Sequence, residues 1–258
     1  MIEEKIYLAN QPAIHFWEGT NMGTGFRIFT GINRPDPSLV EAFRDLPVAN
    51  IADEMNRFGC LDGRIKPLNA APLLGVAFTV KAWTADNLIL HKAIDMALPG
   101  DIIVVDAQAD VGTALIGEIM LRQAIKRRLG GLIIDGAVRD VEALRQMNFP
   151  VYAAGFTPKG PFKNGPGEIN VPVCCGGMVI EPGAILVGDA DGVVAIAPRD
   201  AQAVAAAARK KSLSEQAIFQ QIEQGTLDRS WVDKTLTERG CEIIDATWNS
   251  KTGGDHNG

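Results

Sequence analysis

Residues 129–147, LGGLIIDGAVRDVEALRQM, join a strand-like apolar run to a helix-like pattern through a short polar turn. The apolar run ends at Asp135, and three small residues later come Arg139 and Asp140. The run predicts a buried strand at 132–135, and the spacing from Asp140 onward predicts a helix. Two carboxylates and a guanidinium therefore lie at the connection between a predicted strand and a predicted helix.

The same alternation of strands and helices extends to both sides of this unit. Apolar, β-branched runs predict strands, and longer runs with helical spacing predict helices. In chain order these are strand 74–83, helix 86–98, strand 101–108, helix 113–131, strand 132–135, helix 140–147 and strand 150–155. This order is typical of a mostly parallel, buried sheet with helical cover, so we expect the α/β class.

The flanking segments follow other patterns. Residues 39–58 have helical spacing that stops at Gly59, and residues 200–223 are Ala-rich and helical. Residues 171–196 contain short runs broken by Gly-Gly, Pro-Gly and Asp-Gly, which predict β-hairpins. We therefore expect an N-terminal arm (1–36), a main domain (37–200) and a C-terminal helical extension with a disordered tail (201–258).

Composition excludes several classes of protein. The 258 residues are 47% hydrophobic and 22% charged, and the net charge is −6. A globular chain without a basic stripe is not expected to bind nucleic acid. The start, MIEEKIYLANQ, lacks the apolar run of a secretory leader, and no segment reaches membrane-spanning length. Four cysteines without CxxC spacing favour a reducing compartment, so we expect a cytoplasmic location without membrane contact.

The sequence lacks the common catalytic motifs. The three histidines, His15, His91 and His256, are far apart along the chain, and no HExxH, GxSxG or Walker A pattern occurs. Catalysis, if present, must then rest on carboxylates, arginine, backbone amides and a hard metal ion.

Two segments can bring such groups together. Ligands of open α/β sheets bind beyond the carboxyl ends of the strands. A helix that starts near Gly117 exposes unpaired N–H groups at Glu118, Ile119 and Met120, which suit a carboxylate or a phosphate. The turn after strand 132–135 supplies the second set of groups.

The turn adds a guanidinium and a carboxylate. Arg139 can bind a carboxylate through two parallel hydrogen bonds. Asp140, with Glu118 nearby, supplies oxygen ligands for Mg²⁺ or Mn²⁺, ions that keep several waters and take one or two protein carboxylates. Together these groups predict a site for a small anionic oxo-acid held against a divalent cation.

Each of these residues also has a purely structural interpretation. Asp140 can be the N-cap of its own helix, Arg139 a member of a surface ion pair, and Glu118 a solvated helix residue. Asp135 is expected to hydrogen-bond the turn. Lys81 can be a Schiff-base lysine, although a surface lysine at a strand edge is the preferred interpretation.

Four segments together resemble a known family. NIADEMNRFG, GDIIVVDAQ, ALIGEIMLRQAIKRRLGGLIIDGAVRD and VPVCCGGMVIEPGAILVGDADGVVAI are similar to the RraA-like family over roughly residues 37 to 198. The G-x-V-R-D turn combined with G-E-x-M is the specific part of this likeness. The family includes class II 4-hydroxy-4-methyl-2-oxoglutarate / 4-carboxy-4-hydroxy-2-oxoadipate aldolases and RraA, the regulator of ribonuclease E.

The resemblance implies a fold and an activity. The implied fold is a swivelling β/β/α domain with mixed sheets, assembled as a homotrimer or a hexamer. The implied reaction is metal-dependent cleavage of 4-hydroxy-4-methyl-2-oxoglutarate or 4-carboxy-4-hydroxy-2-oxoadipate to pyruvate and a 2-oxo acid, with oxaloacetate decarboxylation as a side activity. The alternatives are a non-enzymatic regulator of ribonuclease E, and a metal-dependent lyase or hydrolase of another oxo-acid or a sugar acid.

The resemblance also implies a role for each residue at the site. Arg139 would bind the oxo-acid end of the substrate and stabilise the enolate, and Asp140 would bind Mg²⁺ or Mn²⁺ directly. Glu118 would hold the ion through water, while the backbone amides that follow Gly117, at Ile119 and Met120, would bind the pyruvyl carboxylate. Glu215 is the candidate for a carboxylate that reaches the metal site of a neighbouring subunit.

Overall fold

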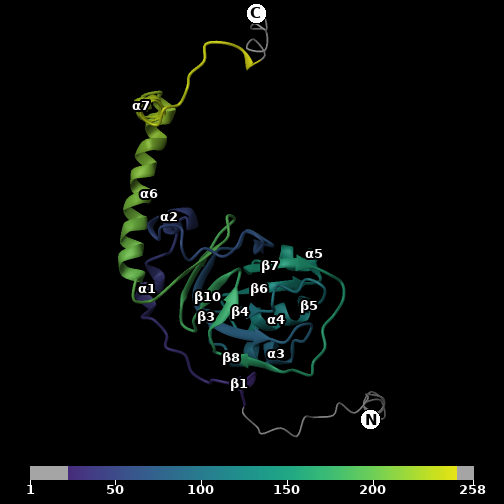
Figure 1. The fold of residues 1–258 in the computed structure, drawn as a ribbon. Coiled ribbons are helices and arrows are strands. Elements are labelled where there is room, and N and C mark those ends of the chain that lie inside the picture. The colour runs from purple at the N-terminus through teal and green to yellow at the C-terminus, as the bar shows by residue number, and fades with distance from the viewer. Residues whose placement is uncertain (1–22, 249–258) are drawn as a thin grey trace, which may run out of the picture. The chain divides into compact units, whose positions relative to one another are not determined.

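Four parallel strands form the centre of the fold: β3 (Leu73–Ala82), β4 (Asp101–Asp106), β6 (Gly131–Val138) and β7 (Val151–Phe156) (Figure 1). β4 and β6 are buried along their whole length. Their sequences, DIIVVD and GLIIDGAV, are apolar on both sides of the chain, as strands with two covered faces must be. The expected parallel arrangement is confirmed for these central strands, while antiparallel edge strands make the sheet as a whole mixed, as the resemblance implies.

The computed structural model describes residues 23–248, and these fall into two units that meet between Ala208 and Arg209. The expected tail at 250–258, most of the expected N-terminal arm, and both His15 and His256 lie outside the described residues.

Shorter strands extend the sheet at both edges. Within the described residues the order is β1-β8-β3-β4-β6-β7-β2, with β11 beside β3, β12 beside β11, and β5 beside β6. These strands are β1 (Phe26–Ile28), β2 (Lys66–Pro67), β5 (Ala114–Ile116), β8 (Gly167–Ile169), β11 (Ile185–Gly188) and β12 (Val193–Ile196). β11 and β12 form an antiparallel hairpin, and β9 (Val173–Cys175) forms another with β10 (Met178–Ile180). The hairpins expected over 171–196 are confirmed.

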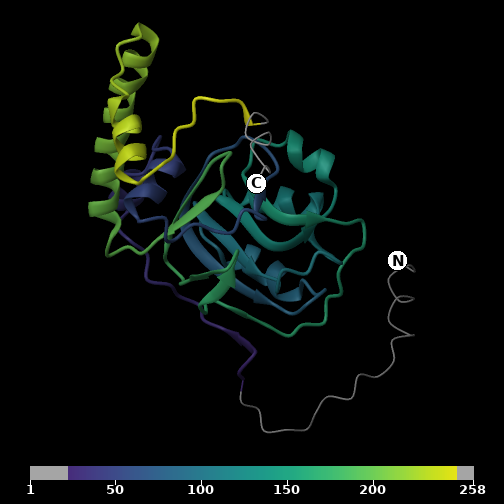
Figure 2. The same ribbon diagram turned by 45° about the horizontal axis from the view of Figure 1, so that its top comes forward.

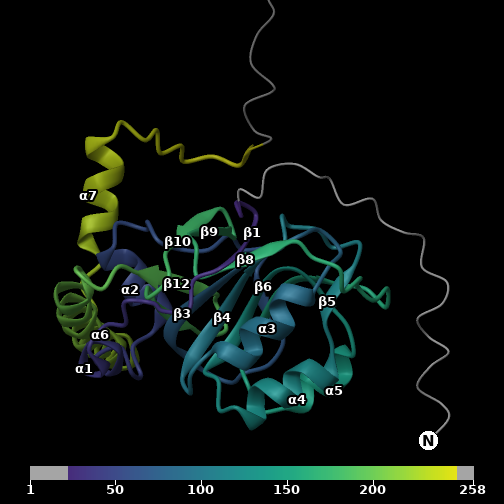
Figure 3. The ribbon, with the colours of Figure 1, turned by 90° about the horizontal axis from the view of Figure 1, so that it is seen from below.

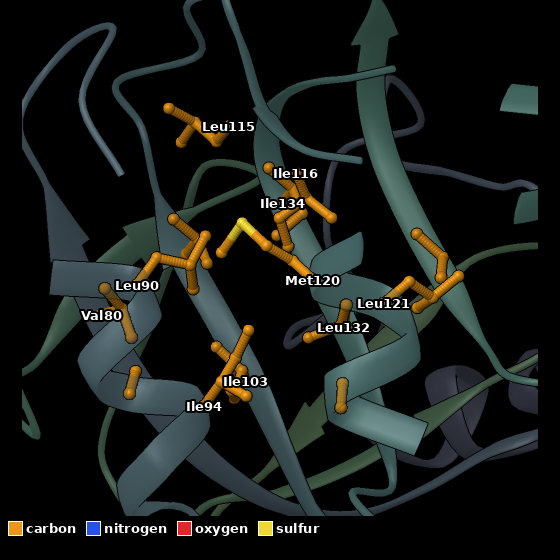
Figure 4. Packing of buried hydrophobic residues seen from close by; sticks show 14 of the residues in the cluster. Val80, Leu90, Ile94, Ile103, Leu115, Ile116, Met120, Leu121, Leu132 and Ile134 are labelled. Atoms are coloured by element: carbon orange, nitrogen blue, oxygen red, sulfur yellow. The ribbon is translucent and has the colours of Figure 1, made fainter. Parts of the chain in front are cut away.

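The two faces of the central sheet have different cover. On one face, α3 (Leu88–Met96), α4 (Glu118–Lys126) and α5 (Val141–Gln146) pack on alternate strand residues such as Ile103 and Leu132 (Figures 3 and 4). On the other, Ile102 and Ile133 pack against the β9–β10 hairpin. Burying a side chain of this size contributes about 1.5–3 kcal/mol, so the two cores fix which way each strand faces.

A third apolar cluster joins the hairpin β11–β12 to the helices α1 (Pro37–Glu41) and α2 (Val48–Glu54). Ala201, Ala205 and Ala208, in the first two turns of α6 (Ala201–Gln224), pack into the same cluster. Their small side chains recur every three or four residues, which is the helical spacing that lets one face lie close to a sheet. The view in Figure 2 shows α2 next to the hairpin strands.

Three predicted elements have different bounds. The helix predicted at 113–131 is strand β5 followed by α4, because Ala114 and Ile116 pair with β6 instead of starting the helix. The strand predicted at 132–135 runs to Val138 for the same reason. The helix predicted at 39–58 is the two short helices α1 and α2. In each case pairing or packing in the folded chain outweighs local helix propensity.

Asp135 does not hydrogen-bond the turn, so that expectation is wrong. It lies in mid-strand, 3% exposed, and its carboxylate accepts hydrogen bonds from Arg64 Nε and Nη2, at 3.2 and 2.8 Å. It also accepts one from the Gly176 amide, at 2.8 Å. The Asp135 carboxylate therefore ties the β9–β10 hairpin to the central sheet.

Asp135→Ala should lower the free energy of unfolding by about 2 kcal/mol, because it removes hydrogen bonds to a charged group and leaves the Gly176 amide unpaired. Arg64 is partly exposed and remains solvated in the variant, which limits the loss. Urea unfolding would measure the change. Glu41→Ala, which removes an exposed pair with Arg44, is the control and should change stability by at most about 1 kcal/mol. Equal stability of the two variants would contradict this role for Asp135.

The second unit contains the rest of α6 and α7 (Ser230–Glu238). The helix expected at 200–223 is confirmed by α6, whereas α7 was not expected. Across residues 23–248, no helix combines the length and apolarity needed to cross a membrane. All four cysteines, Cys60, Cys174, Cys175 and Cys241, are free thiols.

Candidate active site

The pairing of β5 with β6 creates the site. Ile116 lies opposite Val138, so the residues that follow both strands emerge side by side. The Arg139 amide donates to the Ile116 carbonyl at 2.9 Å. Gly117 and Glu118 on one segment thus meet Arg139 and Asp140 on the other, although more than twenty residues separate them in the sequence.

Asp140 caps a helix, but not its own. It occupies the N-cap position of α5 in the left-handed conformation (φ 58°, ψ 37°), and its side chain makes no capping hydrogen bond to that helix. Instead its Oδ2 accepts the Glu118 amide of α4 at 2.9 Å. The interpretation of Asp140 as a simple cap of its own helix is therefore wrong. A carboxylate has about four lone-pair sites, so this bond leaves Asp140 able to bind a cation as well.

Arg139 runs between two glycines. A Cβ at Gly117 would lie 3.0 Å from Arg139 Nε, and one at Gly160 would lie 2.7 Å from Arg139 Nη1. Its Nε is 3.9 Å from Asp140 Oδ2, and both side chains are a little over 40% exposed. An exposed pair at that distance contributes little to stability. The interpretation of Arg139 as a surface ion-pair member therefore explains little of its placement.

Gly117→Ala should disrupt this arrangement. The added methyl would overlap the Asp140 carboxylate and crowd the Arg139 side chain, and the α4 start is held by that same carboxylate. We expect a loss of stability of about 1–3 kcal/mol, as for other overpacked positions, together with loss of ligand binding at the site. Thermal unfolding and ligand titration would measure both. Gly31→Ala is the control, because a Cβ there meets nothing within 4 Å; a wild-type-like Gly117→Ala would contradict the predicted crowding.

The first turn of α4 presents donors to the same place. Glu118 gives its amide to Asp140, while Ile119 and Met120 lie in the first turn, where amides have no acceptor within the helix. Such amides, aided by the helix dipole, favour an anion. The Glu118 carboxylate accepts a hydrogen bond from Arg122 Nε at 2.7 Å, so Glu118 is an ion-paired residue rather than a merely solvated one.

A cavity of about 180 Å³ lies at this junction. Of the predicted site residues, Gly117, Ile119, Met120, Arg139 and Asp140 line it. The remaining lining residues come from α3, β5 and the loop after β7: Asn87, His91, Ala114, Leu115, Ile116, Pro161 and Lys163.

Asn87, His91 and Lys163 were missed by the sequence analysis, which judged histidines only by their separation along the chain. The available signal was Asn-x-x-x-His at the start of a predicted helix, because residues four apart share one helix face. Lys163 gave no local signal. The loop that carries it is held to α3 by the Asn87 amide, which donates to the Phe162 carbonyl at 3.0 Å.

The side chains of Asn87 and His91 have polar atoms without partners. Asn87 is 3% exposed and donates through Nδ2 to the Leu115 carbonyl at 2.8 Å. Among the described residues, its Oδ1 and the His91 Nε2 are buried without a hydrogen-bond partner. Burial lowers the pKa of His91, the nearby Lys163 lowers it further, and Asp95 opposes the change. Neutral imidazole is therefore favoured at neutral pH.

The chemistry of the site fits a hard divalent cation. Within residues 23–248 there is no cluster of three or more His, Cys, Asp or Glu of the kind that encloses a metal completely. Mg²⁺ does not need one, since it takes one or two carboxylates and keeps several waters. Asp140 supplies one carboxylate to the cavity lining. Glu118, whose amide donates to Asp140 Oδ2, does not line the cavity, and its carboxylate pairs with Arg122, so it could reach such an ion only through water.

Two other predicted residues lie elsewhere. Glu215 is part of α6 in the second unit, and its proposed contact with a neighbouring subunit stays a prediction. Lys81 is exposed on β3, opposite Asp106 and Glu168 in the strand register, and does not line the cavity. Its position matches the surface-lysine interpretation.

Comparison with known proteins gives consistent matches. A protein of Halalkalibacterium halodurans named "Putative 4-hydroxy-4-methyl-2-oxoglutarate aldolase" is 36% identical over 207 residues, which cover 80% of this chain and 99% of that protein. The structure of the RNA-processing inhibitor RraA from Thermus thermophilis superposes with a TM-score of 0.55 at 29% identity, over 59% of this chain and 93% of that one. An uncharacterized Pseudomonas syringae protein shares the fold, with a TM-score of 0.69 at 24% identity over 76% and 93% of the two chains.

The family model described as Aldolase/RraA matches residues 48–195, a span that contains the cavity lining from Asn87 to Lys163 and the four central parallel strands. The α/β fold with a mixed sheet agrees with the solved RraA structure. The chain therefore belongs to the RraA-like family.

Proposed function

We propose that the chain is a divalent-metal-dependent aldolase that cleaves a 4-hydroxy-2-oxo acid to pyruvate and a second 2-oxo acid. The preferred substrates are 4-hydroxy-4-methyl-2-oxoglutarate and 4-carboxy-4-hydroxy-2-oxoadipate. The observation that carries the proposal is the convergence of Arg139, Asp140 and the first-turn amides of α4 on one cavity. The name of the Halalkalibacterium halodurans relative supports the same choice.

The residues divide the work according to their chemistry. The Ile119 and Met120 amides would bind the C1 carboxylate, as helix N-termini bind anions. Asp140, and Glu118 through water, would hold Mg²⁺ or Mn²⁺. The bound ion would act as a Lewis acid toward the C2 keto oxygen. Arg139 would donate hydrogen bonds to that oxygen as it gains charge.

Cleavage then follows from charge placement. Loss of the C4 hydroxyl proton lets the C4 oxygen form a carbonyl, and the C3–C4 bond electrons move to the C2–C3 bond of the pyruvate enolate. The charge that appears on the C2 oxygen meets the Arg139 guanidinium, which is already in position. Preorganised donors of this kind contribute about 3–4 kcal/mol each to lowering a barrier. Loss of CO₂ from oxaloacetate gives the same enolate, so decarboxylation should accompany aldol cleavage.

Two other functions compete with this proposal. A ribonuclease-binding regulator is suggested by the similarity to the RraA structure, but a docking surface does not need an arginine and helix amides turned to a cavity. A lyase or hydrolase of another oxo-acid or a sugar acid would use the same groups. The expected trimer or hexamer and the cytoplasmic location are part of the same hypothesis.

A coupled assay of pyruvate release tests the proposal. Oxaloacetate should yield pyruvate with added Mg²⁺ or Mn²⁺ and should not do so above the buffer rate with EDTA. A panel of 4-hydroxy-2-oxo acids would then identify the preferred substrate. If no substrate of the panel is turned over, with or without metal, the protein is not an aldolase. Turnover confined to other oxo-acids would favour the lyase or hydrolase of another oxo-acid or a sugar acid.

A further inference from the structure

The first turn of α3 adds a polar wall to the cavity that the proposed reaction has not yet used. Asn87 is the N-cap residue of α3 and His91 lies one turn further along, and both line the cavity with Arg139 and Asp140. Asn87 is fixed in orientation because its Nδ2 donates to the Leu115 carbonyl, which leaves Oδ1 as the unpaired atom.

Two buried polar atoms without partners are costly in such a wall. Each costs about 1–3 kcal/mol when left unsatisfied. Neither the Asn87 Oδ1 nor the His91 Nε2 has a partner within the described residues, and both residues line the cavity. A ligand that brings a hydroxyl group into the cavity would give the His91 Nε2 its partner, because a hydroxyl donates one proton. The Asn87 Oδ1 also only accepts, so it needs a second donor such as water.

We propose that His91 is the base that takes the C4 hydroxyl proton of the aldol substrate. The inference rests on the proposed aldolase function. In the step, the hydroxyl O–H bond breaks and its proton binds to His91 Nε2. The oxygen lone pair forms the new carbonyl, and the C3–C4 bond electrons pass to the pyruvate enolate. The imidazolium then releases its proton to water, and water protonates C3.

The charges around His91 suit this task. Lys163 faces it from the loop after β7, Asp95 lies one turn further along α3, and Arg139 and Asp140 share the cavity. Burial and Lys163 lower the pKa of His91, so the imidazole is neutral and able to accept a proton at neutral pH.

Comparison of two reactions isolates this role, since decarboxylation of oxaloacetate forms the same enolate but has no hydroxyl proton to remove. In His91→Gln, cleavage of 4-hydroxy-4-methyl-2-oxoglutarate should fall about 10²–10⁴-fold, the usual contribution of a general base. Release of CO₂ from oxaloacetate should stay near the wild-type rate. Lys92→Gln, an exposed neighbour outside the cavity, is the matched control and should leave both reactions unchanged.

Other results have distinct meanings. Equal loss of both reactions in a folded His91→Gln, or loss of neither, would overturn the role of His91 while leaving the aldolase in place. A wild-type protein without either reaction would instead reject the proposed function itself.

The pH dependence of the wild-type enzyme gives a second test of His91 as the base, without a variant. Aldol kcat/KM should decline as the pH falls through a pKa below 6.5, because protonated His91 cannot act as a base. The ratio of aldol cleavage to decarboxylation should decline over the same range. A constant ratio would count against the base.

Discussion

Arg139→Ala should reduce kcat for both aldol cleavage and oxaloacetate decarboxylation by about 10²–10³-fold, the effect of removing one preorganised donor to an oxyanion. Stability should change little. The Arg139 side chain is 43% exposed, and its pair with Asp140 is long, at 3.9 Å, so few native contacts are lost. Steady-state kinetics and thermal unfolding on the same preparation would separate the two effects.

The chain offers a matched control for this substitution. Arg199 is also followed by an aspartate, with Arg199 Nε 3.6 Å from Asp200 Oδ2, but the pair is exposed and lies away from the cavity. Arg199→Ala should keep full activity. Arg139→Lys should recover only part of the rate, because an ammonium lacks the planar pair of donors. Near-normal turnover in Arg139→Ala would reject the proposed function.

Comparison of Asp140→Asn with Asp140→Ala should distinguish the metal-binding role of Asp140 from its role as the cap of α4. Asp140→Asn keeps an oxygen that can accept the Glu118 amide and tolerates the left-handed backbone, so α4 should remain capped. It loses the negative charge that a divalent cation needs. We expect metal-dependent turnover to fall by about 10²-fold or more, with the unfolding temperature close to wild type.

Asp140→Ala should lose the cap as well. Removing a helix cap costs about 0.5–2 kcal/mol, so this variant should be both inactive and less stable. Titration with Mn²⁺, followed by calorimetry, would measure binding in wild type and both variants. If Asp140→Asn binds Mn²⁺ as tightly as wild type, the Asp140 carboxylate is not a ligand of the cation. Equal stability of the two variants would refute the capping role.

The central sheet could be predicted because its information is local. The runs that became β3, β4, β6 and β7 are apolar over most of their length, and a strand covered on both faces leaves that pattern. The helix α4 was predicted within 113–131, but its start at Glu118 could not be told from the preceding strand β5 by the local pattern. Arg139 and Asp140 could be placed at the carboxyl edge of the sheet from their position after an apolar run.

The remaining features depend on contacts between distant segments. β5 reads as helix by itself and becomes a strand only beside β6. Asp135 looks like the end of a strand until Arg64 and the Gly176 amide are known to reach it. His91 joins the site because the β5–α4 junction, more than twenty residues later, packs against α3. No local sequence pattern predicts such contacts between distant segments.

The loop glycine beside Arg139 has a consequence for how the protein can change. At position 117 a methyl would strike the Asp140 carboxylate, which the Glu118 amide holds, and the base of the Arg139 side chain. At position 160 it would meet only the far end of the Arg139 side chain. The two neighbours of the guanidinium thus tolerate mutation unequally. A substitution at Gly160 can change the direction of the Arg139 guanidinium without changing the turn that carries Arg139. Such a substitution could allow other acids to bind.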